Sequence, residues 1–216
     1  GAGVGVVVLL FALPRRWWIG LLLVGGLLMG AAGMAALDLL PSSILDRVSS
    51  SFSETFSITD VRGVNITTEN YALVERLAHW QAAVNMATAN PWFGVGLGNY
   101  EATYEQYRLI AWRFPLGHAH NFYLNILAET GIVGVVAFAT TWALIVFYTW
   151  RARAHPDPQA HIIAAGLLGA WGYLAVHSLT DNLFVNNLFL HIGTMLGLVA
   201  LLYNQARHRT RPPRNA

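Results

Sequence analysis

The sequence contains no cysteine and no lysine, and it is poor in charged residues of either sign. The lack of cysteine excludes disulfide frameworks, thiolate metal sites and cysteine nucleophiles. Charged residues make up 11% of the 216 residues, whereas an ordinary soluble domain contains about a quarter. A soluble globule of this size could not cover its surface with so few charges, and a hydrophobic fraction of 55% excludes disorder. The composition therefore indicates a membrane protein.

Uncharged apolar runs long enough to cross a bilayer as helices recur along the chain. They are Trp17–Leu37, Gly131–Trp150, Ile162–Thr180 and Leu183–Tyr203. Gly1–Leu13 is also apolar but too short to span, and it lacks the basic start of a signal peptide. We interpret it as the end of a helix whose beginning is missing, and we expect the C-terminal part of a larger protein. The predicted fold is all-α and polytopic, with about four complete transmembrane helices and a truncated one.

The positions of the arginines predict the topology. All 13 basic residues are arginine, and eight of them fall on one side of the membrane if every run spans it. The positive-inside rule makes that side cytoplasmic. We therefore expect membrane helices in 1–40, an extracytoplasmic loop over 41–119, further membrane helices in 120–204 and a cytoplasmic basic tail over 205–216.

The extracytoplasmic loop is too long to be a simple connection. Ser42–Thr68 is rich in serine and threonine and predicts irregular structure. Glu69–Ala89 lacks glycine and proline and predicts a helix that ends at Asn90-Pro91. The glycine-rich segment Trp92–Asn99 fits a tight connection better than a nucleotide-binding motif, and it leads to a second predicted helix, Asn99–Trp112.

One face of the first loop helix carries a group suited to ligand binding. Arg76, His79 and Trp80 recur there at spacings of three and four residues, and together they could bind a phosphate or a sugar. The alternative is an interfacial helix whose arginine meets lipid headgroups or pairs with Glu75.

Two histidines, His118 and His120, precede the second apolar run, where we expect the membrane to meet water. Histidine exchanges a proton near neutral pH, which suits acid–base catalysis. A His-x-His pair could also bind a metal, but the sequence offers no nearby cluster to supply further ligands. The spacing therefore favours proton transfer.

Polar residues farther along the chain are expected to face the same region. Asn121, Asn125 and Glu129 form a stripe at helical spacing, which we expect to line a pocket. Asp181 is expected in the outer turn between the last two spans, where it could orient an arginine or a histidine.

These motifs, in this order, resemble those of the O-antigen ligase and polymerase family of bacterial envelopes. The matching stretches are Glu75–Ala82, Asn90–Tyr100, His118–Leu124 and Glu129–Ile132, and the order of membrane spans also agrees. The resemblance implies a membrane glycosyltransferase at the outer face of the cytoplasmic membrane. It would transfer a glycan from an undecaprenyl-diphosphate donor to a hydroxyl of lipid A core or a polysaccharide. The reaction would be inverting, with no metal and no cofactor.

The resemblance also implies residue roles. Arg76 matches the arginine that binds the donor diphosphate, and His120, followed by Asn121, matches the histidine that activates the acceptor hydroxyl. His118 matches less closely. A second phosphate-binding arginine is expected, for which Arg113 and Arg108 are candidates. Asn121, together with Trp80 and Asp181 from the residue pattern itself, completes the expected substrate-binding set.

Other functions remain open at this point. A polymerase of the same family would use the same motifs. A peptidoglycan polymerase would be expected to use an acidic catalytic residue in the outer loop. A lipid-linked sugar transporter would distribute charges along its spans, whereas this chain gathers polar groups in one loop. A structural anchor would explain the spans but not the loop helices.

Overall fold

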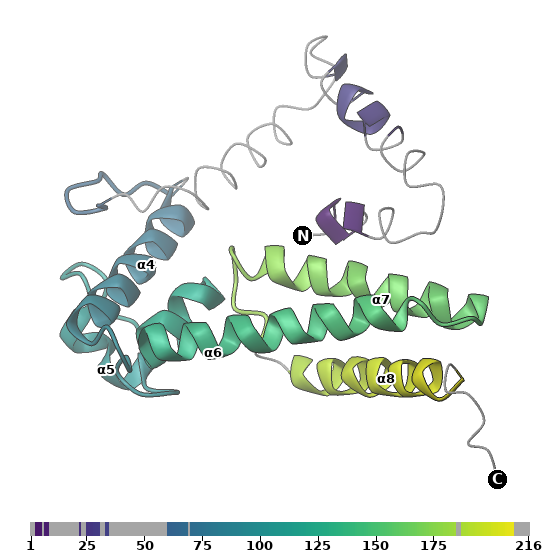
Figure 1. The fold of residues 1–216 in the computed structure, drawn as a ribbon. Helices are drawn as coiled ribbons and strands as arrows, with labels where there is room; N and C mark the ends of the chain where they lie inside the picture. The colour runs from purple at the N-terminus through teal and green to yellow at the C-terminus, as the bar shows by residue number, and fades with distance from the viewer. Residues whose placement is uncertain are drawn as a thin grey trace. The chain divides into compact units, whose positions relative to one another are not determined.

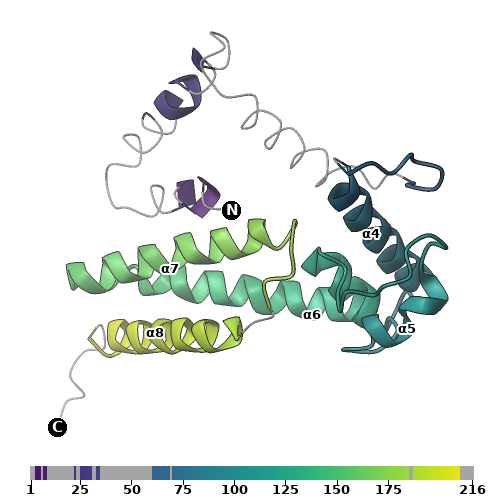
Figure 2. The same ribbon diagram turned by 180° about the vertical axis from the view of Figure 1, so that it is seen from behind.

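The computed structural model describes residues 3–5, 7–8, 22, 25–30, 33–34, 60–68, 70–184 and 187–209. Regular structure in these residues is helical throughout, so the all-α class is confirmed for the described part of the chain (Figure 1). The main helices are α4 (Tyr71–Ala89), α5 (Tyr100–Tyr107), α6 (Phe122–Ala152), α7 (Pro158–His177) and α8 (Leu188–Arg209). The chain divides into two compact units, of which one contains α4, α5 and the start of α6, together with His177–Phe184 (Figure 2).

Within the described residues, three helices are long and apolar enough to cross a membrane. They are α6, α7 and the Leu188–Gln205 part of α8. These correspond to the last three predicted spans, with bounds that differ by a few residues. The predicted span Trp17–Leu37, the truncated helix Gly1–Leu13 and most of the basic tail lie largely outside the described residues.

Helix α4 forms because its 19 residues contain six alanines and no glycine or proline, and it ends where Pro91 denies a further backbone donor. Residues 60–68 before it have no helix or strand, and there Thr67 and Asn70 exchange side-chain hydrogen bonds with each other's backbone N–H groups. Ala82, Ala83 and Met86 of α4 are buried against α5, where Tyr100 and Tyr104 fill the space that the small side chains leave.

Helix α5 ends at Tyr107, five residues earlier than the sequence predicts. The backbone turns at Arg108, which has an extended conformation. The Arg108 guanidinium donates to the carbonyls of Leu109 and Ile110 and binds Glu105 at 2.6 Å. The Arg108 side chain thus satisfies two carbonyls within residues 108–112, which form no helix.

A break in α6 at Gly131 joins this helix to the glycine-rich link. Gly131 has φ 62° and ψ −164°, a conformation open essentially to glycine alone. The break frees the carbonyls of Ala128 and Glu129, which accept the N–H groups of Val95 and Gly96, each at 2.9 Å.

On the other side of the break, the freed N–H groups of α6 also find partners in the link. Ile132 donates to the Pro91 carbonyl at 2.8 Å, and Val133 donates to the Trp92 carbonyl at 3.2 Å. The link therefore takes the place of a missing helical turn, and it fixes α4 and α5 to the start of α6.

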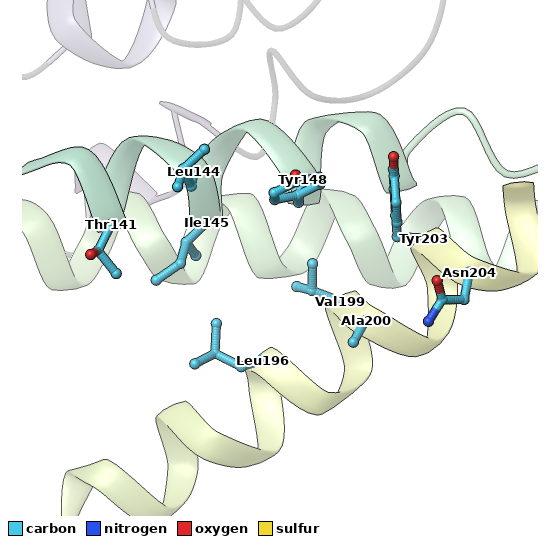
Figure 3. A pocket seen from close by; sticks show the side chains of 9 residues that line it. All are labelled: Thr141, Leu144, Ile145, Tyr148, Leu196, Val199, Ala200, Tyr203 and Asn204. Carbon is cyan, nitrogen blue, oxygen red and sulfur yellow. The ribbon is translucent and has the colours of Figure 1, made fainter.

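The unit that contains α7 and α8 is held by aromatic and polar contacts between helices. Trp171 of α7 donates its indole N–H to Thr149 of α6 at 3.0 Å, and Tyr148 of α6 meets Tyr203 of α8 edge-on. An apolar groove of about 430 Å³ lies between α6 and α8 (Figure 3). These contacts are typical of helices that pack within a membrane.

We expect Gly131→Ala to lower the free energy of unfolding by at least about 3 kcal/mol. A Cβ at this position would collide with the backbone of Trp92 and Phe93, and the conformation itself disfavours alanine. The measurement is thermal unfolding of the protein in nanodiscs.

The matched control is Gly98→Ala. Gly98 also has positive φ, but no atom lies within 4 Å of the added Cβ, so a loss of only about 1 kcal/mol is expected. Equal losses in the two variants would show that the close approach of the link to α6 does not stabilise the protein.

Candidate active site

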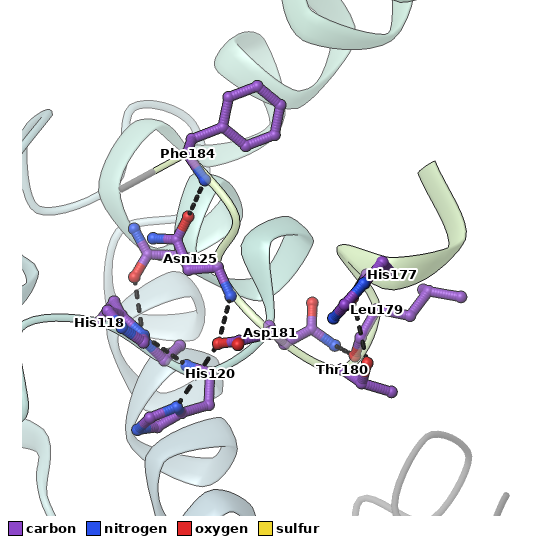
Figure 4. A network of polar contacts seen from close by, with 11 residues as sticks. His118, His120, Asn125, His177, Leu179, Thr180, Asp181 and Phe184 are labelled. Atoms are coloured by element: carbon purple, nitrogen blue, oxygen red, sulfur yellow. Dashed lines mark hydrogen bonds and ion pairs between the residues drawn. The ribbon is translucent and has the colours of Figure 1, made fainter. Parts of the chain in front are cut away.

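Two turns that are distant in sequence bring His118, His120 and Asp181 together. The histidines lie in the turn before α6, and Asp181 lies in the turn after α7 (Figure 4). Potential ligand atoms of the three residues all lie within 4.8 Å of one another. His120 Nδ1 is 3.8 Å from Asp181 Oδ1, which is within ion-pair range, and the two histidine rings are 4.5 Å apart.

His120 has a left-handed backbone conformation, with φ 53°. For a residue other than glycine this conformation costs about 1–2 kcal/mol, so the surrounding structure must enforce it. The neighbours on both sides are anchored. The Ala119 N–H donates to Asn125 Oδ1 at 3.0 Å, and the Phe122 N–H donates to the Ser178 carbonyl at 3.0 Å.

The predicted polar stripe of Asn121, Asn125 and Glu129 is buried and bonded to backbone groups. Asn121 Oδ1 accepts the N–H groups of Tyr123 and Leu124 in the first turn of α6, and its amide donates to the Leu179 carbonyl. Glu129 accepts the N–H of Tyr100. Each of these buried side chains thus satisfies a backbone group. Asn121, predicted to bind substrate, is a helix cap here.

Helix α4 contributes a third histidine to the cluster. His79 is 1% exposed, stacks on Tyr104 with ring centroids 4.9 Å apart, and meets the ring of His120 edge-on at 5.7 Å. Its Nδ1 lies 3.1 Å from the hydroxyl of Tyr100. The sequence placed His79 on the same face as Arg76, but it gave no sign that the ring reaches His120.

A model of the O-antigen ligase family matches residues 1–139, which is more than half of the chain. This chain belongs to the O-antigen ligase family. A comparison with curated proteins gave no match. The predicted resemblance is therefore confirmed, and it supports a membrane enzyme of the O-antigen ligase or polymerase type in lipopolysaccharide biosynthesis. The matched region includes His118 and His120 but ends before Asp181.

Burial keeps His118 and His120 of this O-antigen ligase family member mostly uncharged near neutral pH. Burial lowers the pKa of His120, the charge that His118 carries when protonated lowers it further, and Arg76 acts in the same direction, whereas Asp181 opposes them. Burial also lowers the pKa of His118. A histidine whose pKa lies below 6.5 is mostly neutral at pH 7 and can accept a proton.

His118, His120 and Asp181 form a candidate metal-binding group, with the two histidines and one carboxylate found in some zinc sites. Asp181 supplies a third ligand that is not apparent near the histidines in the sequence. However, the His120 N–H donates to His118 Nδ1 at 3.1 Å, so that nitrogen carries a lone pair. The proton of neutral His118 is then on Nε2 and would have to move before Nε2 could bind a metal. The hydrogen bonding favours a proton-transfer site.

The other predicted site residues differ in burial and in their distance from the histidines. Arg76 is half-buried on α4, close enough for its charge to lower the pKa of His120. Trp80 is 2% exposed and lies in an apolar cluster with Val61 and Trp112, where its ring is unavailable to a sugar.

The two candidates for a second phosphate-binding arginine also differ. Arg108 pairs with Glu105 and lines a separate pocket of about 520 Å³ beside Arg62 and Asn85. Arg113 is exposed just beyond Trp112.

We expect His79 to make stability depend on pH. Burial, and then the charges of protonated His120 and His118, lower the pKa of His79 from 6.5 to about 4. Between these values the unfolded chain binds a proton that the folded protein excludes, so stability falls as pH falls from about 6.5 towards 4. His79→Phe should remove up to about 3 kcal/mol of this dependence, as measured by thermal unfolding in nanodiscs across that range.

Tyr104→Phe is the matched control, because it alters the same cluster without removing the histidine. Burial raises the pKa of Tyr104 to about 12, so this residue does not titrate in the acidic range. The control should keep the dependence of the wild type. An unchanged slope in His79→Phe would contradict the assignment.

Proposed function

We propose that this chain carries the active site of an O-antigen ligase, which transfers a glycan from an undecaprenyl-diphosphate donor to a hydroxyl of lipid A core. A polysaccharide end would replace the lipid A core if the enzyme were a polymerase. The observation that carries the proposal is the surroundings of His120. This histidine lies 3.8 Å from a carboxylate, Asp181, and within electrostatic reach of a cation, Arg76.

His120 acts in this proposal as the general base. Asp181 faces Nδ1, so a proton on Nδ1 points to the carboxylate and Nε2 keeps the lone pair. Nε2 takes the proton of the acceptor hydroxyl while that oxygen forms a bond to the anomeric carbon. The bond from the anomeric carbon to the diphosphate breaks in the same step, which inverts the configuration. The carboxylate of Asp181 then stabilises the imidazolium.

Arg76 acts on the leaving group. Negative charge accumulates on the lipid diphosphate as the glycosidic bond breaks, and a guanidinium can contact two phosphate oxygens without losing its proton. This stabilisation makes a metal unnecessary. Arg113, being exposed, suits a second phosphate contact better than Arg108, which already pairs with Glu105. The glycosyl–diphosphate bond of the donor also supplies the energy of the reaction, which is needed because no ATP is present at the outer face of the cytoplasmic membrane.

The proposed location is the outer face of the bacterial cytoplasmic membrane. The supporting observations are the three apolar helices and the arginines at and just beyond the C-terminal ends of α6 and α8, which the positive-inside rule assigns to the cytoplasm. The turns that contain His120 and Asp181 precede α6 and follow α7, so they would lie on the other side.

We expect His120→Ala to reduce transfer by about 10²–10⁴-fold, because a general base contributes that much. Binding of the lipid-linked donor should persist. The test uses membranes of the source bacterium with the gene deleted, where the donor accumulates, complemented by wild type or variant. Gel analysis of the surface glycan reads the result: bare lipid A core beside intact polymer identifies a ligase, and single repeat units on the core identify a polymerase.

His118→Ala is the companion variant, and it should be less impaired because the His118 Nδ1 lone pair already accepts a backbone N–H. A dead His118→Ala beside an active His120→Ala would reverse the two roles. Translocation of the donor across liposomes without transfer would support a transporter instead. A rate that requires an added divalent cation would contradict the metal-free mechanism.

We expect Arg76→Lys to lose most of the transfer activity, although the charge is retained. An ammonium cannot form the paired contacts that a guanidinium makes with a diphosphate. Initial rates at saturating acceptor should show the loss. Arg62→Lys, at an exposed arginine paired with Asp60, is the matched control and should remain active. Full activity of Arg76→Lys would exclude two-point binding of the diphosphate.

A further inference from the structure

We infer that His79 is a positioning residue for His120, fixed by Tyr100 in the tautomer that carries its proton on Nδ1. This inference rests on the proposed role of His120 as the base. His79 lies outside the residues that the resemblance assigned to the reaction, and its ring meets that of His120 edge-on.

The hydrogen bonds of Tyr100 determine the tautomer of His79. The Tyr100 hydroxyl lies 3.1 Å from the backbone carbonyl of His79 and 3.1 Å from His79 Nδ1. A carbonyl has no proton to donate, so both contacts are hydrogen bonds only when the single phenolic proton is directed to the carbonyl, which is the arrangement we infer. The second contact is then a hydrogen bond only if Nδ1–H is the donor. Burial raises the pKa of Tyr100, which keeps the phenol protonated.

The fixed tautomer matters for the neighbouring histidines. With the proton on Nδ1, the other ring nitrogen of His79 has a lone pair and no proton. His79 therefore has no second donor with which to occupy the lone pair of His120 or His118. Released from Tyr100, the ring could move its proton to Nε2 and become such a donor.

Packing prevents the ring from moving. His79 is 1% exposed, Tyr100 is fully buried, and Tyr104 is stacked on the imidazole with an interplanar angle of 20°. The opposite neighbour is His120, whose ring meets His79 at 73°. His120 thus contacts three side chains, those of His118, Asp181 and His79. Without one of these contacts, its ring could rotate away from the carboxylate.

The first test reads the tautomer directly in the full-length protein. With ¹⁵N-labelled histidine in nanodiscs at pH 7, His79, assigned by comparison with His79→Phe, should give the nitrogen shifts of a neutral Nδ1–H imidazole. Tyr100→Phe should shift these signals towards the Nε2–H tautomer. A wild-type His79 that is protonated on Nε2, or charged, overturns the inference whether or not the Tyr100 variant folds.

The second test links the tautomer to turnover. The probe is the lipid-linked glycan extracted from the gene-deleted strain, with lipid A core from the same strain as acceptor. Tyr100→Phe should lower kcat by about 10- to 100-fold and leave KM for the donor unchanged, because the base is misplaced while the diphosphate site is intact. Tyr104→Phe, the same substitution in the same cluster and helix, should keep the wild-type kcat.

Several results would contradict the positioning role of His79. An unchanged kcat in Tyr100→Phe, a KM change as large as the kcat change, or an equal loss in Tyr104→Phe would overturn the positioning role in favour of general packing. Failure of the proposed function has a separate signature: His120→Ala would retain transfer while the His79 nitrogen shifts remained as expected.

Discussion

The exchange of backbone hydrogen bonds across Gly131 is the constraint on which the rest of the site depends. Helix α6 opens at this residue, and the link between α4 and α5 fills the opening with two donors and two acceptors. An unpaired backbone group in or near a membrane costs several kcal/mol, so the broken helix and the link stabilise each other. Through this junction, the faces of α4 and α5 that carry His79 and Tyr100 are held beside the turn that carries His120.

Burial gives the site its chemical character. The ring of His120 lies 4.5 Å from that of His118 and 5.7 Å from that of His79, and burial lowers the pKa of all three imidazoles. Protonated His118 lowers the pKa of His120 further, and both lower that of His79. The carboxylate of Asp181 raises the pKa of both His118 and His120, and it forms an ion pair with His120. An additional proton is therefore least unfavourable on His120, beside the carboxylate. The half-buried Arg76 adds a cation that lowers the pKa of His120, and in the proposed function the same side chain would bind the donor diphosphate.

The sequence predicted the elements better than the connections between them. Helical spacing put Arg76 and His79 on one face, and the His-x-His motif with the start of α6 followed from the residue pattern alone. The shortening of α5 could not be read from the pattern, because it depends on where the Arg108 side chain donates. Nor could the contact between His120 and Asp181, since it requires the turn after α7 to return to the start of α6. The buried stripe of Asn121, Asn125 and Glu129 had the right spacing, but a pattern cannot tell a pocket lining from a set of backbone caps.

The anchoring of the His120 turn also sets an order in time. Asn121 and Phe122 bond to the carbonyls of Leu179 and Ser178, which the ribosome adds only after the whole of α6 and α7. The strained turn therefore lacks these two hydrogen bonds while α6 and α7 enter the membrane. Asp181 is synthesised just after the residues that accept them. A nascent chain would carry the histidines long before they could act as a base. The reactive arrangement is thus a late product of biosynthesis, completed when the loop after α7 closes onto the beginning of α6.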